Sequence, residues 1–271
     1  MSDRLEVVKD QPRSWSQLSE YERCGHAYFL NRVQRAWNRP ASWLAQGTGI
    51  HEACELWERS GREATREQVE DWFRTAYVRD LNETLAETPN LAFYESSGPY
   101  KGEADALRRY TVGLEHVNRY IDYYTAKPEE VIWLTPDGVP AIELDFTVQF
   151  GSIRVRGKID AVIEKPVKKE TRKIIRDTKS GASAGDPSQL TVYREAVSQL
   201  TGVDVLYGDF LLTKRGTPTR TTDLTLVPRS EIIDRFQEMD QGVKSEIFTP
   251  NPGPNCARCS VRDSCVYREE D

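Results

Sequence analysis

Residues 157–179 of the chain read GKIDAVIEKPVKKETRKIIRDTK. The apolar residues around Asp160 predict one β-strand, and those before Asp177 predict another. Asp177 and Lys179 are two positions apart, so on a strand both side chains leave the same face of the sheet. Asp160 comes from the preceding strand. Two carboxylates from neighbouring strands and one lysine can bind a hard divalent cation and hold a water molecule beside it.

A surface ion pair on two strands is the ordinary alternative, because Asp and Lys are common residues. For Asp177-x-Lys179 alone, this alternative is favoured. The Gly157-x-x-Asp160 motif one strand earlier makes a functional site and a surface pair about equally plausible.

The segments around this stretch predict a mixed α/β domain with a helical region in front of it. We expect a first helix capped by Ser16 or Ser19, and further helices over about 49–59, 66–85, 103–125, 186–202 and 230–247. Strands are expected over 141–150 and 153–164, which form a hairpin around Gly151-Ser152, and over 173–178, 203–213 and 221–227.

The cysteines form a second pattern. Cys256, Cys259 and Cys265 lie close together near the C-terminus, and Cys24 lies far upstream. This spacing is typical of a four-thiolate metal or cluster site rather than of a disulfide framework. Zinc ribbons usually have two C-x2-C pairs and this chain has one, which favours an iron–sulfur cluster and leaves zinc as the alternative. Cys54 is left over and is expected to pack in a helix core.

His51 opens an expected helix just after residues 47–49, which read GTG. A lone histidine is more often a structural or surface residue than a ligand. Glu55 shares its helix face, but the zinc-peptidase motif H-E-x-x-H requires a second histidine there, so that comparison fails. Gln189 and Tyr193 lie four residues apart on one helix face, which alone is weak support for a site.

Composition indicates a globular protein, with 38% apolar and 30% charged residues in a chain of 271. No apolar run approaches the ~20 residues of a membrane span, and the N-terminus lacks a signal-peptide pattern, so we expect a cytoplasmic protein without a membrane partner. The net charge of −6 does not exclude nucleic-acid binding, because phosphate contact depends on local patches. The basic stretches 32–39 and 165–176 are compatible with DNA contact or with ordinary surface charge.

Together these elements resemble the PD-(D/E)XK nuclease superfamily and, more narrowly, its RecB-type exonuclease branch with an iron–sulfur cluster, which includes AddB and the CRISPR-adaptation nucleases. The similarity spans residues 14–268, with Thr178 where relatives often carry an aromatic residue and Gly25 where many have proline. The matching segments are Leu18-Ser19-x-Tyr21-x-x-Cys24, Gly47-Thr48-x-x-His51-Glu52, Glu143, Gly157-x-x-Asp160, Asp177-x-Lys179, Gln189-x3-Tyr193 and Cys256-x2-Cys259-x5-Cys265.

The resemblance implies a restriction-endonuclease-like fold, in which helices flank a mixed β-sheet core. We expect an N-terminal tail over 1–13 and a helical region over 14–128 that carries Cys24 and His51. The nuclease core is expected over 129–249. An iron–sulfur loop over 250–271 would pack back on the N-terminal helix.

The resemblance also implies a role for each matching residue. Mg²⁺ or Mn²⁺ would be bound by His51, Asp160, Asp177 and the backbone carbonyl of Thr178. Lys179 would position or deprotonate the attacking water, and it would complete the catalytic set with His51, Asp160 and Asp177.

The remaining matching residues would support this set. Gln189 and Tyr193 would line the DNA path, and Glu143 would support the site without binding the metal. The ligands of a [4Fe–4S] cluster with a structural task would be Cys24, Cys256, Cys259 and Cys265.

The implied activity is that of a metal-dependent DNA exonuclease that hydrolyses phosphodiester bonds, on single-stranded ends, in recombination, repair or spacer acquisition. A non-catalytic DNA-binding or scaffolding module of a larger nuclease complex is the alternative. An unrelated enzyme with a zinc site is a third option, but the sequence offers no second catalytic constellation for it. A homo-oligomer, or a recombination or CRISPR partner protein, is compatible with the resemblance. The chain has no P-loop motif, which is typical of stand-alone or phage-encoded members.

Overall fold

The computed structural model describes residues 2–96 and 98–268. The described chain divides into two units, and each is built from segments that are far apart in the sequence. The first unit comprises the described parts of Met1–Arg39, Asp145–Gly157 and Val227–Asp271, and the second those of Pro40–Leu144 and Lys158–Leu226. The expected helical region 14–128 therefore contributes to both units, because Cys24 lies in the first and His51 in the second.

One mixed sheet runs through the described residues. Its strands follow the order β1-β3-β4-β5-β6, with β2 also paired to β3 and β7 to β5. The strands are β1 (Val131–Ile132), β2 (Ile142–Phe150), β3 (Ile153–Val167), β4 (Glu170–Lys179), β5 (Tyr207–Leu212), β6 (Thr217–Pro218) and β7 (Thr222–Asp223).

Strands β4 and β5 are parallel neighbours, with Asp177 beside Phe210. A parallel pair needs a crossover connection, and helix α7 (Pro187–Thr201) supplies it. Asp186 caps this helix by accepting a hydrogen bond from the Ser188 N–H, and Gly202 ends it in the left-handed conformation. The helix lies where its cap and glycine predict.

Two antiparallel hairpins precede this crossover. The expected hairpin of β2 and β3 is confirmed, and Gly151 takes the positive φ of 60° that its tight turn requires. Strands β3 and β4 form a second hairpin, in which Ala161 pairs with Arg176. The chain turns there through Lys168 at φ 57°, which no turn-forming residue type signals in the sequence.

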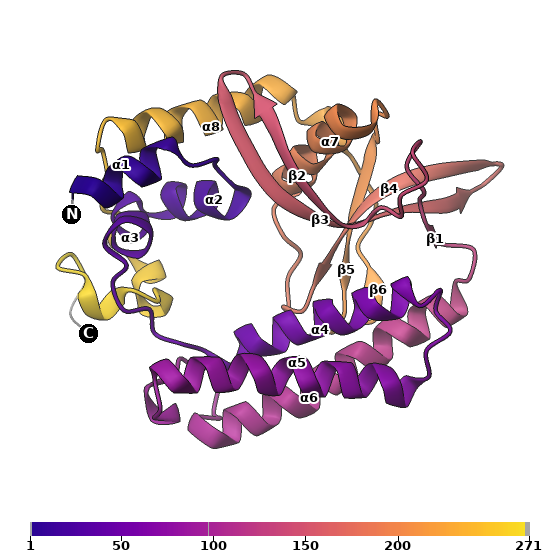
Figure 1. Ribbon diagram of the computed structural model, residues 1–271, viewed down its shortest axis with the longest axis horizontal. Coiled ribbons are helices and arrows are strands. Elements are labelled where there is room, and N and C mark those ends of the chain that lie inside the picture. Colours follow the sequence, from indigo (N-terminus) through magenta and orange to yellow (C-terminus); the bar gives the residue numbers. More distant parts are fainter. Residues whose placement is uncertain (1, 97, 269–271) are drawn as a thin grey trace. The chain divides into compact units, whose positions relative to one another are not determined.

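Three helices of the second unit pack together as a bundle (Figure 1). They are α4 (Ser42–Arg59), α5 (Arg66–Glu87) and α6 (Gly102–Ala126). Phe73 of α5 lies against Gly49 of α4 and Gly113 of α6, in space that a side chain at either glycine would occupy. Helix α4 begins at Ser42 and not near Gly49 as expected, because Gly49 lies inside the helix and allows its close packing against Phe73.

The bundle and α7 cover opposite faces of the sheet. Leu211 of β5 joins the buried core of the three helices, which also contains Cys54, so the expectation for that cysteine is confirmed. Leu190 of α7 lies 3.0 Å from where a side chain would begin at Gly208, also on β5. Positions 208 and 211 are an odd number apart, so they face opposite sides of the strand.

The expected strands 203–213 and 221–227 are shorter in the structure. Strand β5 begins only at Tyr207, and β7 ends at Asp223. The Asp223 carboxylate accepts hydrogen bonds from the N–H and the hydroxyl of Thr225 at 2.9 and 2.7 Å. Such local bonding competes with strand pairing, and a 3₁₀ turn, η3 (Leu224–Leu226), follows.

The first unit is mainly helical. Besides residues 145–157 of the β2–β3 hairpin, it contains α1 (Ser2–Asp10), α2 (Trp15–Arg23), α3 (Gly25–Tyr28), the π-helical turn η1 (Phe29–Gln34), α8 (Arg229–Lys244) and the 3₁₀ turns η4 (Pro254–Arg258) and η5 (Arg262–Ser264). Helix α1 lies in the stretch expected to be a tail. Helix α2 is capped by Ser14, which accepts from the Gln17 N–H, and not by Ser16 or Ser19.

Within the described residues, none of the helices combines the length and the apolar character needed to cross a lipid bilayer.

Candidate active site

Three side chains from separate elements of the second unit converge. They are His51 from α4, Glu143 from β2 and Asp160 from β3, and each offers a ligand atom within 4.8 Å of the others. His51 Nδ1 lies 3.5 Å from Asp160 Oδ2, which also accepts a 2.8 Å hydrogen bond from the Thr178 N–H. The His51 side chain is 33% exposed and that of Asp160 17%, so the group is accessible from solvent.

Asp177 and Lys179 form the adjoining part of the site. Lys179 Nζ lies 2.6 Å from Asp177 Oδ2 and donates a 3.1 Å hydrogen bond to Gln189 Oε1. The Gln189 amide nitrogen donates to Asp177 Oδ1 at 3.1 Å and to the Tyr193 hydroxyl at 2.7 Å. The ion pair with Lys179 at Oδ2 and the Gln189 hydrogen bond at Oδ1 offset part of the cost of burying the Asp177 carboxylate.

The Lys179 side chain is 28% exposed and is partly enclosed by two further residues. Its ammonium lies 5.7 Å from the centre of the Phe210 ring, a cation–π distance. A side chain at Gly185 would begin 2.9 Å from Lys179 Cε. The absence of a side chain at Gly185 therefore leaves the space in which the lysine lies.

Burial makes the charged forms of the acids unfavourable. It raises the pKa of Glu143 to about 7, with Asp160 as a further cause. Burial, and next the charge of Asp177, raises the pKa of Asp160. The pKa of Asp177 is raised by burial against the opposing effect of Lys179. Burial lowers the pKa of His51, which keeps its imidazole neutral near pH 7 with a lone pair available.

This donor set fits a hard divalent cation. Carboxylate oxygens with an imidazole nitrogen suit Mg²⁺ or Mn²⁺, and a nearby cation would reverse the penalty of ionising buried acids. Glu143, expected only to support the site, contributes one of the three convergent ligand atoms. Asp177 instead uses its carboxylate oxygens on Lys179 and Gln189 in this geometry.

A signal for Glu143 was available in the sequence. A two-residue turn at Gly151-Ser152 places position 143 opposite position 160 in an ideal hairpin. The structure also holds Glu143 at φ 47°, which is rare for a residue with a side chain. Such backbone strain often occurs at functional sites.

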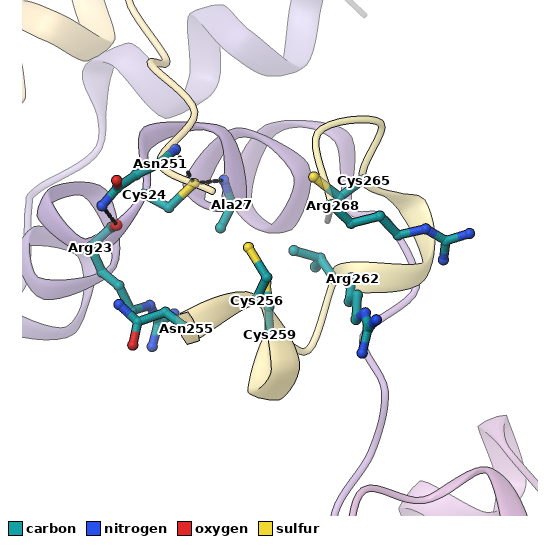
Figure 2. A pocket seen from close by; sticks show the side chains of 11 residues that line it. Arg23, Cys24, Ala27, Asn251, Asn255, Cys256, Cys259, Arg262, Cys265 and Arg268 are labelled. Atoms are coloured by element: carbon teal, nitrogen blue, oxygen red, sulfur yellow. Dashed lines mark hydrogen bonds between the residues drawn. The ribbon is translucent and has the colours of Figure 1, made fainter. Parts of the chain in front are cut away.

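The four other cysteines lie together in the first unit. Figure 2 shows Cys24, Cys256, Cys259 and Cys265 around one pocket, and none of them is in a disulfide. Cys24 Sγ accepts hydrogen bonds from the N–H groups of Ala27 and Asn251, both at 3.4 Å.

The two N–H donors to Cys24 suit a metal–thiolate group, because N–H donors to a cysteine sulfur stabilise thiolate ligands. Arg262 and Arg268 also border the pocket, with their guanidinium groups turned away from the sulfurs (Figure 2). Burial raises the pKa of Cys259, with smaller contributions from Cys24 and Cys265. A cysteine binds a metal as its thiolate, so ligation at Cys259 would release a proton.

A mixed sheet flanked by helices, with acids on adjacent strands and a lysine two residues after the second acid, defines the restriction-endonuclease-like class of fold. The chain belongs to the PD-(D/E)XK nuclease superfamily, whose family model matches residues 12–266. Membership implies a nuclease that acts on DNA and depends on a divalent metal.

Two phage proteins are similar over nearly the whole chain. The Gene 69 protein of Mycobacterium phage D29 is 43% identical over 267 residues, which cover 95% of this chain and 97% of that protein. The Gene 69 protein of Mycobacterium phage L5 is 40% identical over 281 residues, with coverages of 93% and 95%. The names of these relatives state no activity.

Gly185→Ala tests the enclosure of Lys179. The added methyl group would displace Lys179 Cε, and we expect DNA cleavage to fall about tenfold or more, because small misplacements of catalytic groups are costly. The methyl group would also lie 2.9 Å from a ring carbon of the buried Phe210, so we expect the melting temperature to fall as well, and cleavage is compared well below it. Gly181→Ala is the matched control, because no atom lies within 4 Å of its added methyl. Equal cleavage by both variants would contradict the enclosure.

The buried acids predict a pH dependence of stability in EDTA. Between the ordinary carboxyl pKa of about 4 and the raised folded values, the folded state binds more protons than the unfolded state, so the free energy of unfolding falls as pH rises. The lowered pKa of His51 acts in the opposite direction only below about 6.5. We therefore expect thermal stability to fall from pH 6.5 to 8, by at most ~1.4 kcal/mol per group and pH unit.

Two comparisons isolate this effect. Glu143→Gln should reduce the slope, and added Mn²⁺ should raise the melting temperature more at pH 8 than at pH 6.5. An unchanged slope in the variant would show that other groups cause the pH dependence.

Proposed function

We propose that the protein is a metal-dependent DNA exonuclease that acts on single-stranded ends, in recombination, repair or spacer acquisition. The observation that carries the proposal is the convergence of His51, Glu143 and Asp160 beside the Asp177–Lys179 pair. The exonuclease part is supported by the His51 motif and the four cysteines, which resemble those of RecB-type nucleases. In this proposal residues 129–249 supply the nuclease core, and the protein works in the cytoplasm.

The proposed metal ligands are His51, Asp160, Asp177 and the Thr178 carbonyl, to which we add Glu143. When bound, the ion would supply Lewis acidity and lower the pKa of a water molecule. The N–H of Thr178 orients the Asp160 carboxylate. The neutral imidazole of His51 is available as a nitrogen donor beside it.

Lys179 positions water and neutralises charge in this proposal. Its ammonium is held by Asp177 and Gln189, so it is placed at a fixed point next to the acids. From there it can position the attacking water and neutralise charge that develops on the phosphate. Tyr193 fixes the Gln189 amide and thereby limits the positions open to the lysine.

A cleavage assay tests the activity. Single-stranded DNA labelled at either end should be degraded by the wild type with Mn²⁺, whereas Lys179→Ala and Asp160→Asn should each lower the rate by about 10²–10³. Lys127→Ala is the matched control, because Lys127 is exposed directly after α6 and lies outside the basic stretches 32–39 and 165–176. The label that is released first reports the polarity.

Each part of the proposal has its own contrary result. Cleavage of circular single-stranded DNA would contradict an exonuclease while leaving a nuclease. DNA binding without cleavage, retained in Asp160→Asn, would instead support the non-catalytic DNA-binding module. Equal cleavage by wild type and Lys179→Ala would contradict the assigned site.

We further propose that the four-cysteine pocket holds a [4Fe–4S] cluster with a structural task. Three of the thiols come from the loop 250–271 and one from the junction of α2 and α3. Such a group would close a loop of more than 200 residues, so it would restrict the unfolded chain strongly. Four-thiolate zinc is the chemical alternative for the same residues.

Metal analysis of anaerobically purified protein distinguishes the two. A cluster gives a yellow-brown protein with about four iron and four sulfide per chain, which Cys259→Ser should lose together with thermal stability. Cys54→Ser is the matched control, since Cys54 lies in the helix core and should leave the iron content unchanged. Colourless protein with one zinc per chain would overturn the cluster.

A further inference from the structure

The backbone carbonyl of Lys179, like its ammonium, has two hydrogen-bonding or ion-pair contacts. The carbonyl oxygen accepts two hydrogen bonds from Thr213, the residue that follows β5. The Thr213 N–H donates at 3.0 Å and the Thr213 hydroxyl at 3.2 Å. Thr213 is fully buried.

His116 of α6 continues this chain of bonds. Its Nδ1 lies 3.0 Å from the Thr213 hydroxyl oxygen, and its side chain is buried. A hydroxyl has one hydrogen, so if Thr213 donates to Lys179 it accepts from His116. Nδ1 then carries the imidazole hydrogen, and Nε2, which has no hydrogen-bond partner among the described residues, is the bare nitrogen.

The surroundings of His116 favour this neutral form. Burial, followed by the charges of Arg119, Lys214 and Arg109, lowers the pKa of His116 to about 4. Across the working range of a nuclease the imidazole is therefore an uncharged donor of fixed orientation.

We propose that Thr213 and His116 are positioning residues that set the direction in which Lys179 leaves β4. This inference rests on the proposed role of Lys179. Asp177 and Gln189 hold the ammonium, whereas Thr213 and His116 hold the carbonyl at the base of the same residue. A long lysine side chain has many rotamers, and fixing both ends leaves few positions for its nitrogen.

A purely structural role explains less of this arrangement. The Thr213 N–H alone satisfies the carbonyl and continues the pairing of β4 with β5. The second donor, the Thr213 hydroxyl, is buried together with the His116 imidazole, whose Nε2 has no hydrogen-bond partner among the described residues. Burying an unpaired polar atom costs free energy, so packing alone does not favour this arrangement.

Isosteric variants separate the two roles. Thr213→Val keeps the shape of the side chain and the backbone N–H but loses the hydroxyl, and Thr213→Ser keeps the hydroxyl. We expect Thr213→Val to lower kcat about tenfold with unchanged affinity for DNA, and Thr213→Ser to retain most activity. His116→Leu should resemble the first variant, and His116→Asn, which can donate from a similar position, should recover part of the rate.

A second readout does not depend on cleavage. Lys179 in metal-free protein can be labelled with an amine-reactive acylating reagent and quantified by mass spectrometry. A loosened lysine should react several-fold faster in Thr213→Val, while Lys169 in the same sample should react at an unchanged rate. If Thr213→Val does not fold, His116→Leu against His116→Asn provides the same comparison.

The outcomes distinguish this inference from the proposed function. Unchanged Lys179 labelling and unchanged kcat in Thr213→Val would overturn the positioning role, whatever the activity of Lys179→Ala. An equal loss of kcat in Thr213→Val and Thr213→Ser would also overturn it, because the hydroxyl would then not matter. Faster labelling in Thr213→Val, combined with normal cleavage by Lys179→Ala, would leave the positioning intact and remove the proposed function.

Discussion

The buried ion pair between Arg176 and Asp209 fixes β4 against β5, and the site depends on that strand pair. Arg176 binds both carboxylate oxygens of Asp209 at 2.7 and 2.8 Å and also Glu130 at 2.7 Å. Removing one partner of such a pair typically costs ~3–5 kcal/mol, because a charge is left buried and unpaired. The next residue along β4 is Asp177, whose side chain leaves the other face of the strand. Strand β4 thus presents Arg176, which stabilises the fold, on one face and Asp177, which belongs to the site, on the other.

The face of the sheet that carries Asp177 does not stabilise the metal-free fold. Glu143, Asp160 and Asp177 are held close together and largely away from water, and their pKa values are raised as a result. Acids placed in this way destabilise a metal-free fold once they ionise, and they bind a cation more strongly for the same reason. The buried ion pairs of Arg176 and the core of the three helices offset the loss of stability that these acids cause.

Local patterns predicted the elements well where one physical signal dominated. Helices α6 and α7 and strand β2 lie within a residue of their expected bounds, and β3 begins as expected but ends three residues later, at Val167. Errors arose where distant packing outweighed local preference. Gly47 and Gly49 suggested a late start for α4, but Phe73 packs against Gly49 and the helix continues through both positions. The lysine turn between β3 and β4 is set by strand pairing and not by a turn-forming residue.

The sequence by itself determined the class of fold and the types of chemical group. Strand periodicity places Asp177 and Lys179 on one face, and the spacing of the four cysteines indicates a thiolate metal site. Only the tertiary structure decided which groups meet. Glu143 joins His51 and Asp160 because a helix and a hairpin approach each other there, and Thr213 and His116 reach the Lys179 carbonyl from elements far along the chain. Distances between such elements are set by the packing of a whole core, which no short stretch of residues encodes.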